Sequence, residues 1–243
     1  MQDRAAVITG ASRGIGFVLA KTLAEEGYQL TISARRPDRL EAAAEKLRED
    51  GHTVTAVAVN MADESAVRTV IDHHREAYGR LDVLVNNAGV GIGASAAEHQ
   101  TKHIDLQLQL NLRAIVFSYR EAAQLLRAAG AEHGSALVVN LASMAGKSGQ
   151  PWLSVYSATK AAVISYTESM NKEFSEDGVK SVALCPAFVD TDMTEFVRGE
   201  IPRDKMIRPE DLGLALRFLL HVSPACVVPE IMFQQPGGGQ FGA

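Results

Sequence analysis

Short apolar runs rich in β-branched residues alternate with longer polar and alanine-rich segments along nearly the whole chain. This alternation restricts the possible folds more than any other feature of the sequence. The short runs are apolar at consecutive positions, so strands formed from them are expected to be buried on both faces. Strands of this kind, separated by helices, form a parallel sheet that is covered by helices on both sides. The sequence therefore predicts an α/β fold with a doubly wound parallel sheet of about seven strands.

Glycine and proline residues delimit the predicted helices. The predicted strands span residues 4–9, 28–33, 53–59, 81–86, 135–141, 179–185 and 227–233, and the predicted helices span residues 14–26, 37–50, 63–78, 101–129, 154–176 and 209–221. Glycines that can adopt a positive φ follow these helices at Gly27, Gly51, Gly79, Gly130 and Gly178. Pro37 and Pro209 occupy predicted first turns, where a helix does not need the missing N–H.

The composition is typical of one globular domain. The chain has 243 residues, of which 47% are hydrophobic and 22% are charged, and no linker, internal repeat or low-complexity stretch divides it. We therefore expect residues 1–243 to form a single domain. The formal net charge of −5 and the lack of a basic cluster with interleaved aromatic residues argue against binding to nucleic acid or to an anionic membrane.

The cysteines and the hydropathy pattern predict the cellular compartment. Cys185 and Cys226 belong to no CxxC pair and fit free thiols in a reducing compartment, although one disulfide between them is also compatible with the sequence. The first residues do not form a signal-peptide pattern, and no stretch approaches the roughly 20 apolar residues that span a membrane. The expected location is cytoplasmic, without membrane association.

A glycine-rich turn follows the first predicted strand and opens the first predicted helix. Its residues are Thr9, Gly10, Ala11, Ser12, Arg13, Gly14, Ile15 and Gly16, a TGxxxGxG spacing that differs from the general GxGxxG dinucleotide fingerprint. Glycines let a phosphate approach main-chain N–H groups, and the start of a helix attracts the anion. Taken alone, such a segment fits a plain tight turn equally well. Between a strand and a helix at the head of an alternating chain, it predicts a dinucleotide site.

The residues after the second predicted strand indicate which dinucleotide binds. An acidic residue there would bind the adenosine ribose 2′-hydroxyl and select NAD(H), but this chain has Arg35 and Arg36. Guanidinium groups suit a 2′-phosphate, and Arg13 of the glycine turn offers another. The alternative is that both arginines are solvated residues at a helix start, a position that usually favours acidic residues. The sequence therefore predicts NADP(H) as the cofactor.

Tyr156 and Lys160 are the clearest candidates for acid–base chemistry. Positions i and i+4 share one face of a helix, so the ammonium of Lys160 is expected near the phenol of Tyr156. Lowering a phenol pKa from about 10 to about 7 needs roughly 4 kcal/mol, which a cation about 4 Å away supplies at an effective dielectric constant near 20. The same spacing is common on solvated helix faces, so the pair alone does not establish catalysis.

Three motifs together resemble those of the short-chain dehydrogenase/reductase family. They are TGASRGIG at residues 9–16, Asn86-Asn87-Ala88-Gly89 after the fourth predicted strand, and Tyr156-Ser157-Ala158-Thr159-Lys160. The resemblance covers essentially the whole chain and looks closest to NADPH-dependent carbonyl reductases of the 3-oxoacyl-carrier-protein reductase type. It implies a Rossmann-type fold and a homotetramer or homodimer. It also implies a helix at residues 104–112, although their strict apolar–polar alternation would by itself predict a strand.

The resemblance implies a catalytic set of Asn111, Ser143, Tyr156 and Lys160. Tyr156 would be the proton donor, and Ser143 would hydrogen-bond the substrate carbonyl oxygen. Lys160 would lower the pKa of Tyr156 and bind ribose hydroxyls, and Asn111 would hold a water that relays protons to Lys160. Two of these residues have a simpler, non-catalytic alternative. Ser143 would then be a loop serine that satisfies backbone groups, and Asn111 would be a buried amide at a helix irregularity.

The resemblance implies further contacts to the cofactor and a lid. Beyond the glycine turn and the arginines, the implied cofactor-binding residues are Asn60, Met61, Asn87, Ala88, Gly89, Tyr156, Lys160, Pro186, Val189 and Thr191. The family usually has an aspartate facing the adenine where this chain has Asn60-Met61, and a glycine where it has Ala187. We therefore expect altered adenine contacts and a slightly narrower nicotinamide pocket. Residues 190–207 would form a mobile lid over the substrate.

The predicted function is reduction of a ketone or aldehyde to an alcohol by hydride transfer from NADPH. The alternatives are an NAD-dependent alcohol dehydrogenase, an NADP(H)-sensing regulatory protein without turnover, and a structural scaffold. Completeness of the catalytic set argues against a regulatory protein. The spacing of His99 and His103 is accompanied by no ordered set of cysteine, histidine and acidic residues, so no metal site is predicted.

Overall fold

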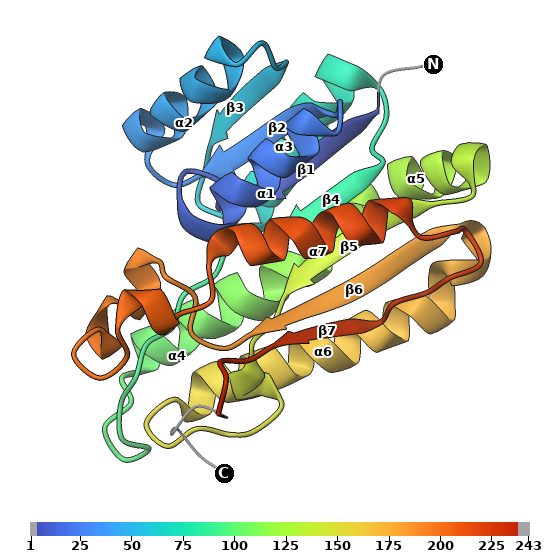
Figure 1. Ribbon diagram of the computed structural model, residues 1–243. Helices are drawn as coiled ribbons and strands as arrows, with labels where there is room; N and C mark the ends of the chain where they lie inside the picture. Colours follow the sequence, from blue (N-terminus) through green and yellow to red (C-terminus); the bar gives the residue numbers. More distant parts are fainter. Residues whose placement is uncertain (1–3, 238–243) are drawn as a thin grey trace.

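The computed structural model describes residues 4–237, in which one parallel sheet lies between two layers of helices (Figure 1). The strands are β1 (Ala5–Thr9), β2 (Gln29–Ala34), β3 (Val54–Ala58), β4 (Val83–Asn86), β5 (Ala136–Leu141), β6 (Val179–Pro186) and β7 (Glu230–Phe233). Within the described residues they form a seven-stranded sheet in the order β3-β2-β1-β4-β5-β6-β7. Every neighbouring pair is parallel, which confirms the predicted doubly wound sheet.

Helices cover both faces of this sheet. The principal helices are α1 (Gly14–Glu25), α2 (Pro37–Glu49), α3 (Glu64–Tyr78), α4 (Thr101–Leu108), α5 (Ala114–His133), α6 (Ser154–Phe174) and α7 (Pro209–His221). Residues of α1, α2 and α7 join one buried apolar cluster with the sheet, and residues of α3, α5 and α6 join a second one on the opposite face. The two layers explain why the strands are apolar at consecutive positions.

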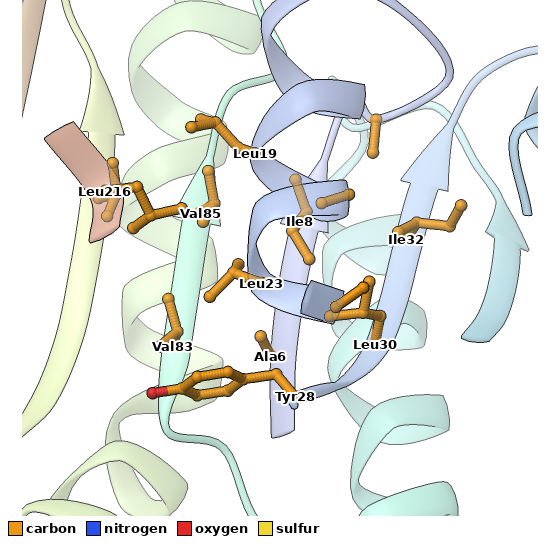
Figure 2. Packing of buried hydrophobic residues seen from close by; sticks show 14 of the residues in the cluster. Ala6, Ile8, Leu19, Leu23, Tyr28, Leu30, Ile32, Val83, Val85 and Leu216 are labelled. Carbon is orange, nitrogen blue, oxygen red and sulfur yellow. The ribbon is translucent and has the colours of Figure 1, made fainter. Parts of the chain in front are cut away.

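The side chains of β1 show this two-sided burial directly. Ala6 and Ile8 belong to the cluster beneath α1 and α7, where they pack with Leu19, Leu23 and the other residues shown in Figure 2. Val7, which points to the opposite face, belongs to the second cluster. Every residue of β1 is buried, as expected for a central strand of a parallel sheet.

The order of the strands places a topological switch point between β1 and β4. The strand order reverses at this pair, because β1 leads to α1 on one face and β4 leads to helices on the other. Ligands of open α/β sheets bind at such a switch point, beyond the carboxyl ends of the strands. The loop before α4 and the orange segment near residue 200 extend beyond this end of the sheet in Figure 1.

Gly130 does not end a helix, contrary to the sequence prediction. Helix α5 continues to His133 and ends at Gly134, which has a φ of +68°. Gly130 lies inside the helix, where an added Cβ would stand only 2.5 Å from the carbonyl oxygen of Asp177. The glycine therefore serves close approach between α5 and the turn at Gly178, and not termination of the helix.

The predicted helix over residues 101–129 is also interrupted. After α4, residues Gln109–Arg113 form a π-helical turn (η1) before α5 begins. The helical prediction for residues 104–112 is thus confirmed over the strand pattern, with a local irregularity that periodicity did not reveal. Strand β7 begins at Glu230, three residues later than predicted. The other predicted bounds agree with the structure within two residues at each end.

Both cysteines are free, Cys185 buried and Cys226 exposed, so the disulfide alternative is not realised. Over residues 4–237, no helix has the length and apolar character required to cross a bilayer.

His74 of α3 is a buried, uncharged histidine beneath the sheet. Its side chain is fully buried, and its Nδ1 atom lies 2.8 Å from the hydroxyl oxygen of Thr31 in β2. Burial lowers the pKa of His74 to about 4, because the charged imidazolium would lose its hydration.

The free energy of unfolding should therefore fall as the pH decreases from about 6.5 to about 4. In this range the unfolded chain binds a proton at His74 that the folded protein excludes, a difference of about 3 kcal/mol. Urea unfolding across this pH range would measure the loss in the wild type and in His74→Gln. The neighbouring His73 is exposed, so His73→Gln is the matched control. An unaltered pH dependence in His74→Gln would contradict the assignment.

Candidate active site

The glycine turn after β1 is joined to the end of β4 by the side chains of Asn87 and Thr9. The amide nitrogen of the Asn87 side chain donates hydrogen bonds to the carbonyl oxygens of Thr9 (2.9 Å) and Gly10 (3.0 Å). In return, the hydroxyl oxygen of Thr9 accepts hydrogen bonds from the backbone N–H groups of Asn87 and Ala88, both at 3.0 Å. These four bonds hold the glycine turn against the end of β4 at the switch point.

The glycines of this turn are required by close backbone contacts. A Cβ at Gly16 would lie 2.5 Å from the carbonyl oxygen of Gly10, closer than atoms can approach. Gly10 and Gly14 have positive φ values of 68° and 56°. A Cβ at Gly14 would also contact Thr191 at 3.3 Å, so the loop after β6 reaches the turn. The start of α1 at Gly14 thus presents backbone N–H groups beside a surface without side chains, which suits a phosphate.

A cluster of arginines flanks the turn. Arg35 and Arg36 are exposed directly after β2, and within residues 4–237 neither forms an ion pair. The pKa of Arg36 is lowered by desolvation and by the neighbouring positive charges of Arg39, Arg13 and Arg35. Arg13 itself forms an ion pair with Asp192. The structure therefore brings together the three arginines that the sequence predicts for the 2′-phosphate.

Asn60 and Met61, the candidate adenine-binding residues after β3, differ in their burial. Asn60 is exposed, and its side-chain oxygen accepts a hydrogen bond from the backbone N–H of Ala62 at 3.3 Å. Met61 is buried in the apolar cluster on the α3 face, and its sulfur accepts a hydrogen bond from Ser33 at 3.8 Å. Only the backbone of Met61 remains for the predicted contact with an adenine.

Lys160 is a buried lysine at the centre of the site. Its Nζ atom donates a hydrogen bond to the carbonyl oxygen of Leu141, at the end of β5, at 2.6 Å. The side chain is 5% exposed, and burial lowers the pKa of Lys160 to about 8. One added Cβ at Gly89 would stand 3.6 Å from this Nζ atom and 3.2 Å from Oδ1 of Asn111, so both polar groups lie beside Gly89.

The prediction that Lys160 lowers the pKa of Tyr156 is wrong, because the pKa of Tyr156 is raised in the structure. The Nζ atom of Lys160 lies 5.7 Å from the centre of the Tyr156 ring and is engaged with Leu141. Burial raises the pKa of Tyr156, and a hydrogen bond with Ser143 acts in the opposite direction. Helical spacing placed the two residues on one face, but it did not reveal that burial would raise the pKa of Tyr156.

Ser143 satisfies backbone groups, as the simpler alternative for this residue predicted. Its hydroxyl oxygen accepts a hydrogen bond from the backbone N–H of Ala145 at 3.1 Å, and its hydroxyl donates to the carbonyl of Pro186 at 3.4 Å. It thus caps the short 3-10 helix η2 (Met144–Gly146) after β5. The same hydroxyl interacts with Tyr156, so the serine reaches the candidate proton donor.

Asn111 lies in the π-helical turn and is fully buried. Its side-chain oxygen accepts from the backbone N–H of Val90 at 2.8 Å, and its amide group donates to the carbonyl of Val90 at 2.9 Å and to Thr159 at 3.1 Å. These contacts match the alternative of a buried amide at a helix irregularity. One lone pair of the side-chain oxygen is left for a further donor.

One residue of the site, Gln107, was not identified from the sequence. Gln107 is fully buried, and its side-chain oxygen accepts a hydrogen bond from the backbone N–H of Ile92 at 3.1 Å. It precedes Asn111 by four positions, and both side chains hold the segment that follows Gly89. This spacing of two amides on one helix face was visible in the alternating stretch, but only burial distinguishes them from solvated residues.

The predicted lid segment, residues 190–207, contains two short 3-10 helices. They are η4 (Asp192–Val197) and η5 (Arg203–Lys205), and Asp190 forms ion pairs with Arg198 and Arg203. A bridge between Val189 and Ile207 joins the two ends of the segment. Met193 and Phe196 are 50% and 59% exposed, so they present apolar surface near the site.

A metal centre finds no support among residues 4–237. No group of three or more histidine, cysteine and acidic side chains in this part of the chain could hold a metal ion.

Comparisons with known proteins match most of the chain. The family model described as short chain dehydrogenase matches residues 4–201. An uncharacterized oxidoreductase of Staphylococcus haemolyticus is 32% identical over 222 residues, which cover 90% of this chain and 92% of that protein. An alcohol dehydrogenase from the archaeon Thermococcus sibiricus, complexed with 5-hydroxy-NADP, has a TM-score of 0.87 at 29% identity and covers 96% of this chain and 97% of its own. A 3-ketoacyl-(acyl-carrier-protein) reductase from Brucella melitensis, complexed with NADH, has a TM-score of 0.86 at 27% identity and covers 96% of both chains.

The hydroxyl of Thr9 should contribute more to stability than an exposed threonine hydroxyl. Thr9→Val keeps the shape of the side chain but leaves the N–H groups of Asn87 and Ala88 without their acceptor, which we expect to cost about 2–4 kcal/mol of unfolding free energy. Thr69→Val removes an exposed hydrogen bond to Ser65 within α3; it is the matched control and should change the unfolding free energy by less than about 0.5 kcal/mol. Urea unfolding measures both. Equal effects of the two substitutions would refute the role of Thr9.

Proposed function

Because this chain belongs to the short-chain dehydrogenase family, we propose that it is an oxidoreductase that reduces a ketone or aldehyde to an alcohol with NADPH. The observation that carries this proposal is the convergence of Ser143, Tyr156 and Lys160 beside the loop that follows β4. A proton donor, a hydrogen-bonding hydroxyl and a buried cation at one site are the groups that such a reduction requires.

The proposed cofactor site combines the glycine turn with the arginine cluster. The turn from Gly10 to Gly16 would hold the pyrophosphate at the start of α1, and Arg13, Arg35 and Arg36 would hold the 2′-phosphate. Ala88, Gly89, Pro186, Val189 and Thr191 would line the nicotinamide end, with Asn60 near the adenine. When bound, NADPH would supply a hydride to the carbonyl carbon. NADP and NADH complexes among the structural relatives support a nicotinamide dinucleotide in general.

Tyr156 would supply the proton that balances the hydride. The C=O double bond of the substrate becomes a C–O single bond, and the electron pair left on oxygen takes the phenol proton. The raised pKa of Tyr156 keeps the phenol protonated at neutral pH, as a proton donor requires. Ser143 would donate a hydrogen bond to the same oxygen while its negative charge develops.

Lys160 and Asn111 would restore the proton of Tyr156. The ammonium of Lys160, although anchored to Leu141, keeps two further N–H donors for ribose hydroxyls or water. A relay water would donate to the remaining lone pair of Asn111 Oδ1, which lies beside Lys160 across Gly89. Asn111 also positions Val90 by two hydrogen bonds.

Three further expectations accompany this proposal. Residues 190–207 would act as the substrate lid, and the apolar surface of Met193 and Phe196 suits an apolar substrate. A homotetramer or homodimer and a cytoplasmic location stay predictions from the family resemblance and the sequence.

An NAD-dependent alcohol dehydrogenase of the same family is the second candidate. It is favoured by one observation: a structural relative with 27% identity is complexed with NADH. The arginine cluster argues for NADPH, so a comparison of the two cofactors separates the candidates.

Replacing the phenol of Tyr156 should strongly lower turnover while the protein still binds NADPH. Tyr156→Phe keeps the ring but removes the proton donor, which we expect to lower kcat by about 100-fold or more. NADPH oxidation with a panel of ketones and aldehydes measures kcat, and NADPH titration measures the Kd. Tyr78→Phe, a remote tyrosine that bonds Leu30, is the control. Full activity in Tyr156→Phe would overturn the proposal.

The arginine cluster should discriminate between the two nicotinamide cofactors. We expect Arg35→Ser/Arg36→Ser to raise the Kd for NADPH by roughly 10- to 100-fold, because bonds to the 2′-phosphate are lost, and to leave the Kd for NADH nearly unchanged. Arg48→Ser, at the far end of α2, is the matched control for loss of positive charge. A wild-type preference for NADH would sink the assignment of Arg35 and Arg36.

A further inference from the structure

We propose that Trp152 determines substrate specificity, and that its indole accepts a planar aromatic substituent on the carbonyl compound. This inference rests on the proposed function and names the substrate class of the same site. Trp152 lies in the loop between β5 and α6, four residues before Tyr156.

The indole lies flat against Gly93 in the loop between β4 and α4. A Cβ added to Gly93 would stand 2.5 Å from two atoms of the indole ring, so any larger residue would displace the ring. The carbonyl oxygen of Trp152 also accepts a hydrogen bond from the backbone N–H of Ala94 at 2.9 Å. The two loops are thus fitted to each other at this tryptophan.

The same loop places the indole beside the proposed proton donor. A Cβ added to Gly91 would lie 3.6 Å from the ring of Tyr156. Two residues later in the same loop, Gly93 lies against the ring of Trp152. Two residues of extended chain span at most about 7 Å, so both rings lie along one short segment. A carbonyl group at Tyr156 would therefore carry a neighbouring substituent to the indole.

The lid segment contributes a second aromatic ring. The ring centres of Trp152 and Phe196 are 5.7 Å apart at an interplanar angle of 56°. This separation is typical of stabilising aromatic pairs, and a further flat ring placed against them would gain the same interaction. Phe196 comes from η4, so loops after β4, β5 and β6 all meet at Trp152.

The indole is held in place without being buried. Trp152 is the only residue other than glycine with a positive φ in residues 4–237, at 69°, which is unusual for a bulky side chain. Strained conformations of this kind persist where the surroundings impose them, commonly at ligand sites. Trp152 is nevertheless 52% exposed, and Phe196 is 59% exposed. A residue that served only packing would be covered, so the free surface of this pair is assigned to the substrate.

A binding experiment without turnover tests the proposal directly. Trp152 is the only tryptophan in the chain, so indole fluorescence reports on this position alone. The protein with saturating NADPH would be titrated with benzyl alcohol and with cyclohexylmethanol, which differ in planarity and cannot exchange hydride with a reduced cofactor. We expect saturable fluorescence changes and a Kd about five-fold lower for benzyl alcohol. Equal Kd values, or no saturable change, would overturn the proposal.

Substitutions at Trp152 and Gly93 test whether the planarity of the indole or only its size determines the substrate preference. The measured quantity is the ratio of kcat/KM for benzaldehyde to kcat/KM for cyclohexanecarbaldehyde, relative to the wild-type ratio, so that intrinsic reactivity cancels. Trp152→Phe should keep the ratio, whereas Trp152→Leu and Gly93→Ala should lower it about five-fold. Phe218→Leu, an exposed aromatic residue on α7, is the control and should leave it unchanged. An unchanged ratio in Trp152→Leu would refute the role of Trp152.

The two experiments distinguish this proposal from the proposed function. If no carbonyl compound oxidises NADPH while benzyl alcohol still binds in preference to cyclohexylmethanol, the reductase function fails and the aromatic site stands. If aldehydes are reduced without any planar preference, the function stands and the role of Trp152 fails. Thermal unfolding of each variant shows whether the variant is folded. If a variant does not fold, the fluorescence titration of the wild type still tests the preference for a planar substituent.

Discussion

The rest of the site depends on the hydrogen bonds that connect the end of β1 to the end of β4. The two strands are neighbours, but the chain leaves them toward opposite faces of the sheet, so their ends would separate without a connection. Asn87 and Thr9 make this connection through four hydrogen bonds, and the absence of a Cβ at Gly16 lets the backbone close around it. The glycine turn and the loop that carries Gly89 thereby acquire fixed positions.

A second set of buried polar contacts fixes α6, which carries Tyr156 and Lys160. The side-chain amide of Asn86 donates to Asn140 at 2.9 Å, and the amide of Asn140 donates to Thr167 of α6 at 2.9 Å. These bonds link β4, β5 and α6 inside the apolar core, where unpaired amides would be costly. Lys160 adds its bond to Leu141. The candidate proton donor therefore belongs to a helix whose rotation against the sheet is restricted by directional bonds.

The sequence supported much of the fold and the position of the site, for identifiable reasons. Burial of strands on both faces requires apolar residues at consecutive positions, and that pattern is visible without coordinates. The glycine turn was recognisable because backbone approach excludes side chains. Gly130 was misinterpreted, since a glycine needed for contact with Asp177 cannot be distinguished by type from one that ends a helix. The pKa of Tyr156 was misjudged because desolvation depends on neighbours from several elements.

Local sequence by itself determined the order of strands and helices, the place of the cofactor turn and the shared helix face of Tyr156 and Lys160. These features depend on periodicity and residue type within a few turns of chain. Only the tertiary structure decided that Asn111 and Gln107 hold one loop and that Lys160 is anchored to Leu141. It alone brought Trp152, Gly93 and Phe196 together. Such contacts join residues far apart in the chain, and their energies depend on burial, which no local pattern specifies.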